Sequence, residues 1–309
     1  MGGFLGELGK RLAERWLSLL VLPGVLYLAV AAAARVLGQR DPFAVHRLTA
    51  QVTEWAKAPA ATTLGGQVVL LAAVLLGAAA VGLWAQALGS FVERAVLAAG
   101  WRSLPRPLRR PVAARVEWRR RRWSAARERY HGARNAAARA LATRTPFDHS
   151  ERHVAHHAMT RIAQERPERP TWSGDRLHAV ALRLDRDLRL DLAVVWPVLW
   201  FHVPQETRGE VTAGREAVSA AAALGGWAVP YGLLAWWWWP AAVVAAVMAV
   251  TARKRLRLAL EAYAQTVEAV TRLHAGALAQ QLGIEHTGVL PPEAGAALSS
   301  HLRGGAAPD

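Results

Sequence analysis

Residues 217–252 read AVSAAAALGGWAVPYGLLAWWWWPAAVVAAVMAVTA and contain no Asp, Glu, Lys or Arg. One continuous helix of this length would be about 54 Å long, whereas the hydrocarbon core of a bilayer is about 30 Å thick. Four tryptophans and a proline interrupt the run, at Trp236, Trp237, Trp238, Trp239 and Pro240. Indole rings gather where hydrocarbon meets water, and proline suits the first turn of a helix. We therefore predict two membrane-spanning helices, 211–236 and 240–252, joined by an interfacial turn.

The second of these helices is short, so a hairpin that does not fully cross the membrane is an open alternative. Two other apolar runs, 16–38 and 66–91, are long enough to span. The first run follows Lys10, Arg11 and Arg15, so a signal peptide is the competing interpretation. In the second run, small residues would let a neighbouring helix approach closely; they are Gly77, Ala80 and Gly82.

The distribution of positive charge predicts the orientation. Residues 92–216 carry 25 Arg and 14 acidic residues, whereas 39–65 carry only Arg40, Arg47 and Lys57. Cytoplasmic loops are enriched in Lys and Arg. We expect a four-helix, multi-pass protein of the inner (cytoplasmic) membrane, with both termini and an Arg-rich helical domain (92–210) in the cytoplasm. We also predict an amphipathic N-terminal helix (1–15) and an external loop (39–65) between the first two spans.

Arginine dominates the composition of the polar segments. The net charge is +15, with 35 Arg and three Lys, and there is no cysteine, which excludes disulfides and thiol chemistry. A helix predicted to run from Pro111 to about Ala142 contains WRRRRW at 118–123. Val116, Trp123, Tyr130 and Ala137 recur every seven residues, which indicates a packing seam that Arg119 interrupts.

The Arg helix has three interpretations: a nucleic-acid contact, an anionic lipid contact, or a solvated helix that follows the positive-inside bias. No nucleic-acid-binding motif accompanies it, so a nucleic-acid partner is disfavoured. We expect lipid-surface contacts from this helix and from the cluster that follows the fourth span; the residues are Arg119, Arg120, Arg121, Arg122, Arg253, Lys254 and Arg255.

A histidine-rich segment follows. Asp148–Glu151 has a helix-capping pattern, and His149, His153 and His157 share one helix face. Spacing of four suits a zinc ligand pair, which makes His153 and His157 the candidate metal ligands, although a pair needs further ligands from elsewhere. A plain polar face and a pH-responsive surface are the alternatives.

Residues 171–203 predict a soluble core. Ser173 or Asp175 is expected to cap a helix with a stripe of Leu177, Val180, Leu184 and Leu188. Pairs such as Arg183–Asp187 lie four residues apart, so we interpret Asp185, Asp187 and Asp191 as ion-pair partners rather than catalytic acids. The apolar run Leu192–Val203 is too short to span, and we expect it to pack on the His and Arg helices rather than lie among headgroups.

The C-terminal part is predicted to be one long helix and a tail. A helix is expected to start near Gln205 and enter the third span, and helical periodicity continues after the fourth span through 253–283. A seam of Leu256, Leu260, Tyr263 and Val267 suits packing on the Arg helix or on another subunit. Gly, Ala and Pro dominate 284–309, which predicts a flexible tail.

Three segments carry a resemblance: RPTWSGDRLHA (169–179), DLAVVWPVLWFHVP (191–204) and AWWWWPAA (235–242). They resemble a group of Arg/Ala-rich polytopic membrane proteins of actinobacteria, which implies a topology but no mechanism. Residues 211–283 are also similar in organisation to SLATT-type membrane effectors of bacterial conflict systems, in which a membrane hairpin leads into a soluble helix.

No nucleotide-binding, metalloprotease or serine-hydrolase motif is present, so no catalytic residue and no cofactor is expected. The fold class expected is all-α. The leading hypothesis is a non-enzymatic membrane protein whose cytoplasmic domain associates with a protein partner or with a second copy. An oligomeric pore or membrane-perturbing effector, and a membrane-anchored metal-dependent enzyme, are the alternatives.

Overall fold

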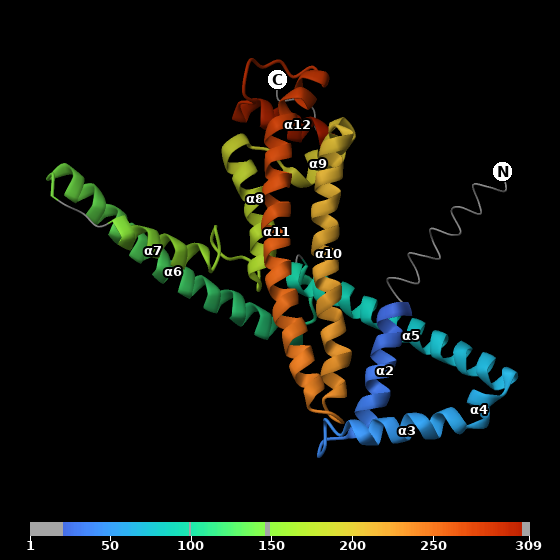
Figure 1. Cartoon of the computed structure of the whole chain (residues 1–309). Coiled ribbons are helices and arrows are strands. Elements are labelled where there is room, and N and C mark those ends of the chain that lie inside the picture. Colours follow the sequence, from blue (N-terminus) through green and yellow to red (C-terminus); the bar gives the residue numbers. More distant parts are fainter. Residues whose placement is uncertain (1–20, 99, 146–148, 305–309) are drawn as a thin grey trace, which may run out of the picture. The chain divides into compact units, whose positions relative to one another are not determined.

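In the computed structural model, the described residues are 21–98, 100–145 and 149–304, and they form helices and connecting turns with no strand. The all-α prediction is confirmed. Contacts divide the chain into a first unit, Met1–Glu93 with Ser219–Leu256, and a second unit, Arg94–Val218 with Arg257–Asp309. Figure 1 labels the main helices. Their bounds are α2 Leu22–Leu37, α3 Val45–Lys57, α4 Pro59–Thr62, α5 Leu64–Leu97, α6 Arg106–Ala142, α7 His149–Thr160, α8 Trp172–Leu188, α9 Leu192–His202, α10 Gln205–Leu234, α11 Pro240–Gln281 and α12 Pro292–Leu302.

The long apolar run divides where the Trp residues predict. Helix α10 begins at Gln205 and ends at Leu234, and α11 begins at Pro240 and continues without a break to Gln281. Proline at the first position needs no backbone N–H partner there, which explains the sharp start of α11. The predicted N-terminal helix (1–15) lies outside the described residues, as does the first part of the 16–38 run.

Helices of the first unit approach each other through glycine. A Cβ added to Gly226 of α10 would lie 2.5 Å from Ala85 O and 2.5 Å from Gly89 N of α5. A Cβ on Gly24 of α2 would likewise overlap the backbone of Ala78. These backbones are therefore in contact, as in the small-residue interfaces of membrane helices. Of the predicted contact positions, Gly82 is buried, Gly77 is half-buried and Ala80 is exposed.

Helix α5 buries its small residues and exposes its large ones. Its buried residues are Ala78, Gly82, Ala85 and Gly89. Leu76 is 72% exposed and Leu83 is 57% exposed, on the same helix. A water-soluble helix buries its large apolar side chains. The pattern in α5 is the reverse.

Two of the described helices are long and apolar enough to cross a membrane, Leu64–Leu97 and Gln205–Leu234. Helix α2 and α9 are apolar but shorter. Since a core helix or a signal sequence can have the same length and composition, these two helices support membrane association and leave the number of crossings as a proposal.

The second unit has a conventional apolar core. It is formed by α8, α9, α11 and α12, with Leu184, Leu190, Leu199, Leu278 and Leu298 among its fully buried residues. The predicted stripe on α8 is confirmed, since Val180, Leu184 and Leu188 are buried and Leu177 packs against them. Helix α9 packs in this core rather than on the His and Arg helices, so the partner predicted for it is wrong.

The C-terminal region also differs from the prediction. Residues 292–302 form α12 instead of a flexible tail, and Leu298 is 0% exposed. A Cβ on Gly295 would overlap the carbonyl of Leu188, so α12 lies directly on the end of α8. Composition alone misses this helix because its stability comes from packing rather than from its own propensity.

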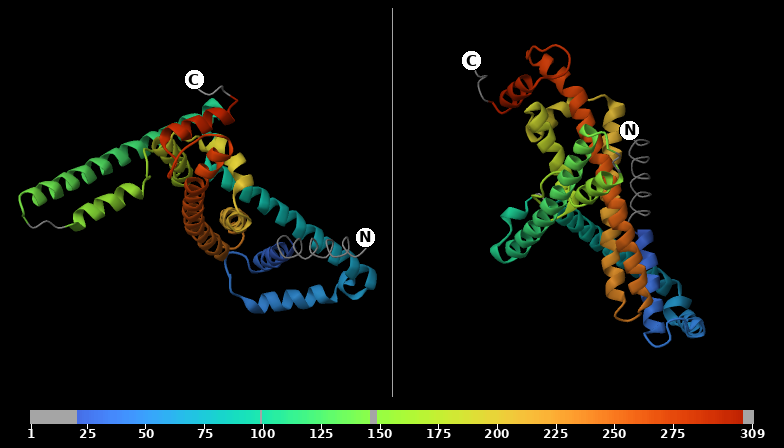
Figure 2. Two further views of the ribbon diagram at one scale, coloured as in Figure 1. Left: turned by 90° about the horizontal axis from the view of Figure 1, so that it is seen from above. Right: turned by 90° about the vertical axis from the view of Figure 1, so that its left-hand side faces the viewer.

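Helices α6 and α7 form a hairpin, and both views of Figure 2 show them side by side. The predicted seam on α6 is confirmed in part, since Val116 and Trp123 are buried whereas Tyr130 and Ala137 are half-buried. Arg119 is buried in the same seam, although its charge argues against that position. The groups that surround Arg119 explain this exception.

Candidate functional site

The segment between α7 and α8, residues 161–171, presents a row of backbone carbonyls to α6. Trp101 Nε1 donates to Glu168 O at 3.0 Å, and Trp123 Nε1 donates to Ala163 O at 3.0 Å. Three arginines donate to the same segment: Arg115 Nε to Pro170 O at 3.1 Å, Arg120 Nε to Pro167 O at 2.9 Å, and Arg119 to Arg169 O at 2.7 Å and Ile162 O at 2.6 Å. We call these five donors the carbonyl clasp.

The spacing of the clasp donors follows from helix geometry. Arg115, Arg119 and Trp123 are four residues apart on α6, so they lie on one face. The segment that they hold contains Pro167 and Pro170, which cannot continue a helix. Its carbonyls therefore need donors from outside the segment, and the guanidinium groups provide them.

Asp175 closes the clasp from the first turn of α8. Its Oδ2 accepts from Arg119 at 2.6 Å, and its Oδ1 accepts from the backbone N–H groups of Glu168 at 2.9 Å and Arg169 at 2.8 Å. Both side chains are buried, with 5% of Asp175 and 7% of Arg119 exposed. Burial raises the pKa of Asp175 and lowers the pKa of Arg119, and the attraction between the two charges opposes both shifts.

Groups of the protein itself occupy the hydrogen-bonding positions around Asp175 and Arg119. All the named polar atoms of Asp175 and Arg119 bond to the chain itself, so the pair organises the fold rather than presenting an acid to a substrate. The prediction of a lipid-surface contact is therefore wrong for Arg119. The predicted cap of α8 is also different, since Thr171 Oγ1 accepts from Gly174 N at 3.1 Å and Asp175 binds the preceding loop instead.

The remaining arginines of α6 are directed mainly to solvent. Arg120 is half-buried, whereas Arg121 has 80% of its side chain exposed and lies near Glu117. The guanidinium of Arg122 lies 4.7 Å from the ring centre of Trp118, which is itself 51% exposed. The exposed arginines of α6 are Arg106, Arg109, Arg110, Arg115, Arg121, Arg122, Arg127, Arg129, Arg134 and Arg139. This helix has only two acidic residues, so its surface is strongly positive.

The predicted metal ligands lie on the exposed face of α7. His153 and His157 are both exposed, and His156 lies against Tyr130 of α6 with 5.3 Å between ring centres. Within the described residues, no group of three or more His, Asp or Glu side chains is placed to hold a metal ion. The part of the chain that the structure describes thus brings no further ligand to the pair, and zinc binding stays a prediction.

The four tryptophans predicted to lie at the membrane interface form the turn between α10 and α11. Trp236, Trp237 and Trp239 are exposed, while Trp238 is half-buried and its Nε1 donates to Pro42 O at 3.0 Å. The predicted basic cluster, Arg253, Lys254 and Arg255, is exposed on α11.

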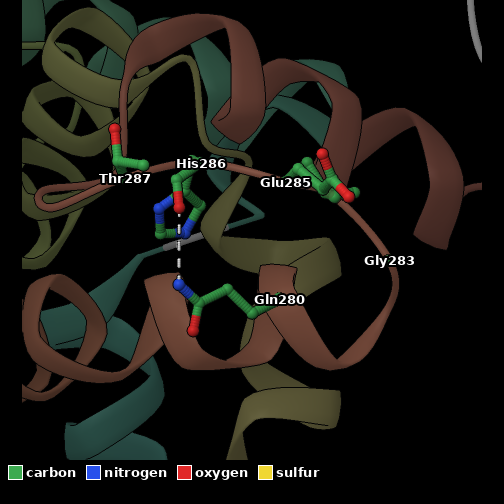
Figure 3. Close-up of a pocket in the computed structure, with 6 residues that line it drawn as sticks. Gln280, Gly283, Glu285, His286 and Thr287 are labelled. Atoms are coloured by element: carbon green, nitrogen blue, oxygen red, sulfur yellow. Dashed lines mark hydrogen bonds between the residues drawn. The ribbon is translucent and has the colours of Figure 1, made fainter.

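A shallow cavity of about 620 Å³ lies at the end of α11, where the helix leads into the loop before α12. Its lining includes His286, whose Nε2 is 3.1 Å from Gly276 O, and Gln280, whose side chain reaches the His286 carbonyl at 3.5 Å. Figure 3 shows the carboxylate of Glu285 lying apart from this imidazole. The lining therefore places no acid–base pair in hydrogen-bond contact.

Comparison with known proteins finds no matching family model, no similar curated protein and no similar solved structure. The sequence analysis does not predict the carbonyl clasp. Two features pointed to it: Arg119 interrupts an apolar seam, and Asp175 follows a turn that contains Pro167 and Pro170.

Proposed function

We propose that this chain is a multi-pass protein of the inner membrane, with four crossings and both termini in the cytoplasm, and that its second unit is a non-enzymatic docking unit. The main support for the membrane assignment is that α5 buries its small residues and exposes its large apolar ones. Leucines such as Leu76 and Leu83 face outward while Gly and Ala are buried. Lipid is a solvent in which that arrangement has no hydrophobic penalty.

Helix lengths and charges support the topology. Helix α5 has 34 residues and α10 has 30, more than the roughly 20 residues that span a hydrocarbon core. Helices α5, α10 and α11 each continue from the first unit into the second. The second unit carries most of the Arg residues, as expected for a cytoplasmic part.

The docking role rests on α6. The carbonyl clasp holds one face of α6 against the loop at 161–171, while arginines such as Arg121 and Arg129 stay exposed. A rigid helix with exposed guanidinium groups and one exposed Trp fits an acidic protein surface, because arginine pairs with carboxylates through two hydrogen bonds. Two copies meeting through this face would repel, so a second copy would have to bring an acidic surface to it.

The topology is testable with single cysteines, because the natural chain contains none. Thr53→Cys, in α3, should react with a membrane-impermeant maleimide on intact cells. Ser124→Cys, in α6, should react only after the cells are made permeable. Equal reaction of both positions on intact cells, or recovery of the full chain from the soluble fraction without detergent, would refute the membrane assignment.

The docking role needs a separate experiment. A photo-crosslinker at Arg121 should give a discrete adduct in native membranes, whereas one at Thr53 should give none of the same size. Changing Arg122 and Arg129 to Glu should reduce the yield several-fold without changing the amount of protein in the membrane. Unchanged yield in that variant would show that charge on α6 does not select the partner.

A further inference from the structure

Helix α3 is strongly amphipathic, although it contains no buried residue. Val45, Leu48, Val52 and Trp55 recur at helical spacing and form one apolar stripe. Three of them are largely exposed: Val45 is 65%, Val52 is 51% and Trp55 is 47% exposed. Arg47 and Glu54 lie about half a turn away, so the opposite face is polar.

A helix of this kind needs a surface to lie on. Helix α3 has 13 residues, a length at which an isolated helix is marginal in water. Its polar face carries two exposed ion pairs, Lys57 with Glu54 at 3.6 Å and Arg47 with Asp41 at 2.7 Å, and such exposed pairs contribute little. The apolar stripe is therefore the main source of stabilisation, provided that something covers it.

The chain just before α3 is fastened to the Trp turn. Gln39 Nε2 donates to Ala235 O at 2.8 Å and to Trp236 O at 2.9 Å, and Gln39 Oε1 accepts from Trp239 N at 3.1 Å. Phe43 meets Trp239 edge-on, with 6.1 Å between ring centres. Because Phe43 is 69% exposed, the apolar surface continues from the Trp turn to the start of α3.

The direction of α3 fits an interfacial helix. Figure 1 shows α3 running across the end of α2 instead of continuing along its direction. If α2 crosses the bilayer, α3 lies in the plane of the membrane. Indole rings prefer that same depth, where their apolar body and N–H group are both satisfied.

We propose that α3 and the Trp turn together form an interfacial anchor, with the apolar stripe of α3 embedded among lipid headgroups and upper acyl chains of the outer leaflet. This inference deepens the proposed function and rests on it. The occupant is lipid rather than a second copy, because four partly exposed side chains offer much less than the roughly 800 Å² per partner of a stable protein interface. Interfacial helices typically embed by about 5–10 Å.

The test uses spin labels on the full chain in phosphatidylcholine–phosphatidylglycerol vesicles. Labels at Val52→Cys and Trp55→Cys should be relaxed several-fold more by oxygen, relative to a water-soluble nickel complex, than a label at Glu54→Cys on the opposite face. A label at Leu76→Cys, on α5, reports separately on membrane insertion.

The outcomes separate the two proposals. Nickel-accessible labels at Val52 and Trp55, with an oxygen-accessible label at Leu76, would overturn the anchor and leave the membrane assignment intact. Nickel accessibility at all these positions would overturn both. Spin–spin broadening at Val52 that disappears when unlabelled chain is added would show that a second copy covers the stripe, and would also overturn the anchor.

Discussion

Arg176 and Glu261 are joined by two hydrogen bonds, from Nε at 2.7 Å and from a terminal guanidinium nitrogen at 2.9 Å, and they are 85 residues apart in the chain. The same separation recurs in Arg183–Glu268 and in Asp187–Arg272. Helices α8 and α11 therefore lie parallel and in constant register, with charges facing each other at corresponding positions. This register replaces the pairing of Arg183 with Asp187 that the i, i+4 spacing predicts.

Because of these ion pairs, the free energy of unfolding should depend on pH. Hydrogen bonds from Arg176 hold the pKa of Glu261 below its usual value of 4.5, and those from Arg183 do the same for Glu268. Since both folded-state pKa values lie below the unfolded ones, the pairs contribute stability above about pH 4.5 and lose it as the pH falls further. We expect the unfolding temperature in detergent to fall between about pH 6 and pH 3. In Glu268→Gln that fall should be smaller; an equal fall would contradict the assignment.

Substitution within the buried pair Asp175–Arg119 should destabilise the second unit more than substitution of an exposed pair does. Asp175→Asn removes the charge that compensates Arg119, and loss of one partner of a buried pair costs about 3–5 kcal/mol. We expect the free energy of unfolding of the second unit to fall by that amount in denaturant titrations followed by Trp fluorescence. Glu117→Gln is the matched control, since Glu117 pairs with Arg121 on the exposed side of the same helix. Equal stability of the two variants would show that the clasp contributes nothing.

Because α5 and α10 are in close contact, adding one methyl group at Gly226 should lower stability. In Gly226→Ala, the new Cβ would meet backbone atoms of Ala85 and Gly89, which cannot move independently of the helix. Overpacking of this kind costs about 1–3 kcal/mol, so the variant should unfold at a lower temperature in detergent. Gly232→Ala, on the same helix, would place its Cβ 3.9 Å from Ala245 and should be neutral. A neutral Gly226→Ala would mean that the two helices are not in backbone contact.

The Trp turn should depend on Gln39. Because its amide bonds to three backbone groups between Ala235 and Trp239, Gln39→Ala leaves two carbonyls and one N–H without that partner. Each lost bond contributes about 1 kcal/mol. We expect faster hydrogen exchange at 235–239, measured by mass spectrometry of the chain in detergent. Gln67→Ala, which removes a bond to Ala61 O only, should leave exchange at the Trp turn unchanged.

Local patterns were enough to predict the long helices, whereas α3 and α4 lie in a segment predicted as a loop and α12 lies in one predicted as a tail. The start of α10 at Gln205, the start of α11 at Pro240 and the end of α6 at Ala142 all follow from apolar periodicity and from Pro at a first turn. The seam of α6 and the stripe of α8 follow from the same 3.6-residue period. Such features depend on neighbours in the chain, so a sequence read alone is sufficient for them.

Tertiary structure decided which of these surfaces meet. Arg119 is buried because Asp175 and the carbonyls of a loop more than 40 residues away surround it, and no local pattern encodes that environment. Helix α12 exists because α8 and α9 offer it an apolar surface, although its Gly- and Ala-rich sequence predicts a tail. The sequence by itself determined where α10 gives way to α11 and which helices are apolar enough for a membrane. Only the fold decided which charges are buried, because the cost of burying a charge depends on partners that are distant along the chain.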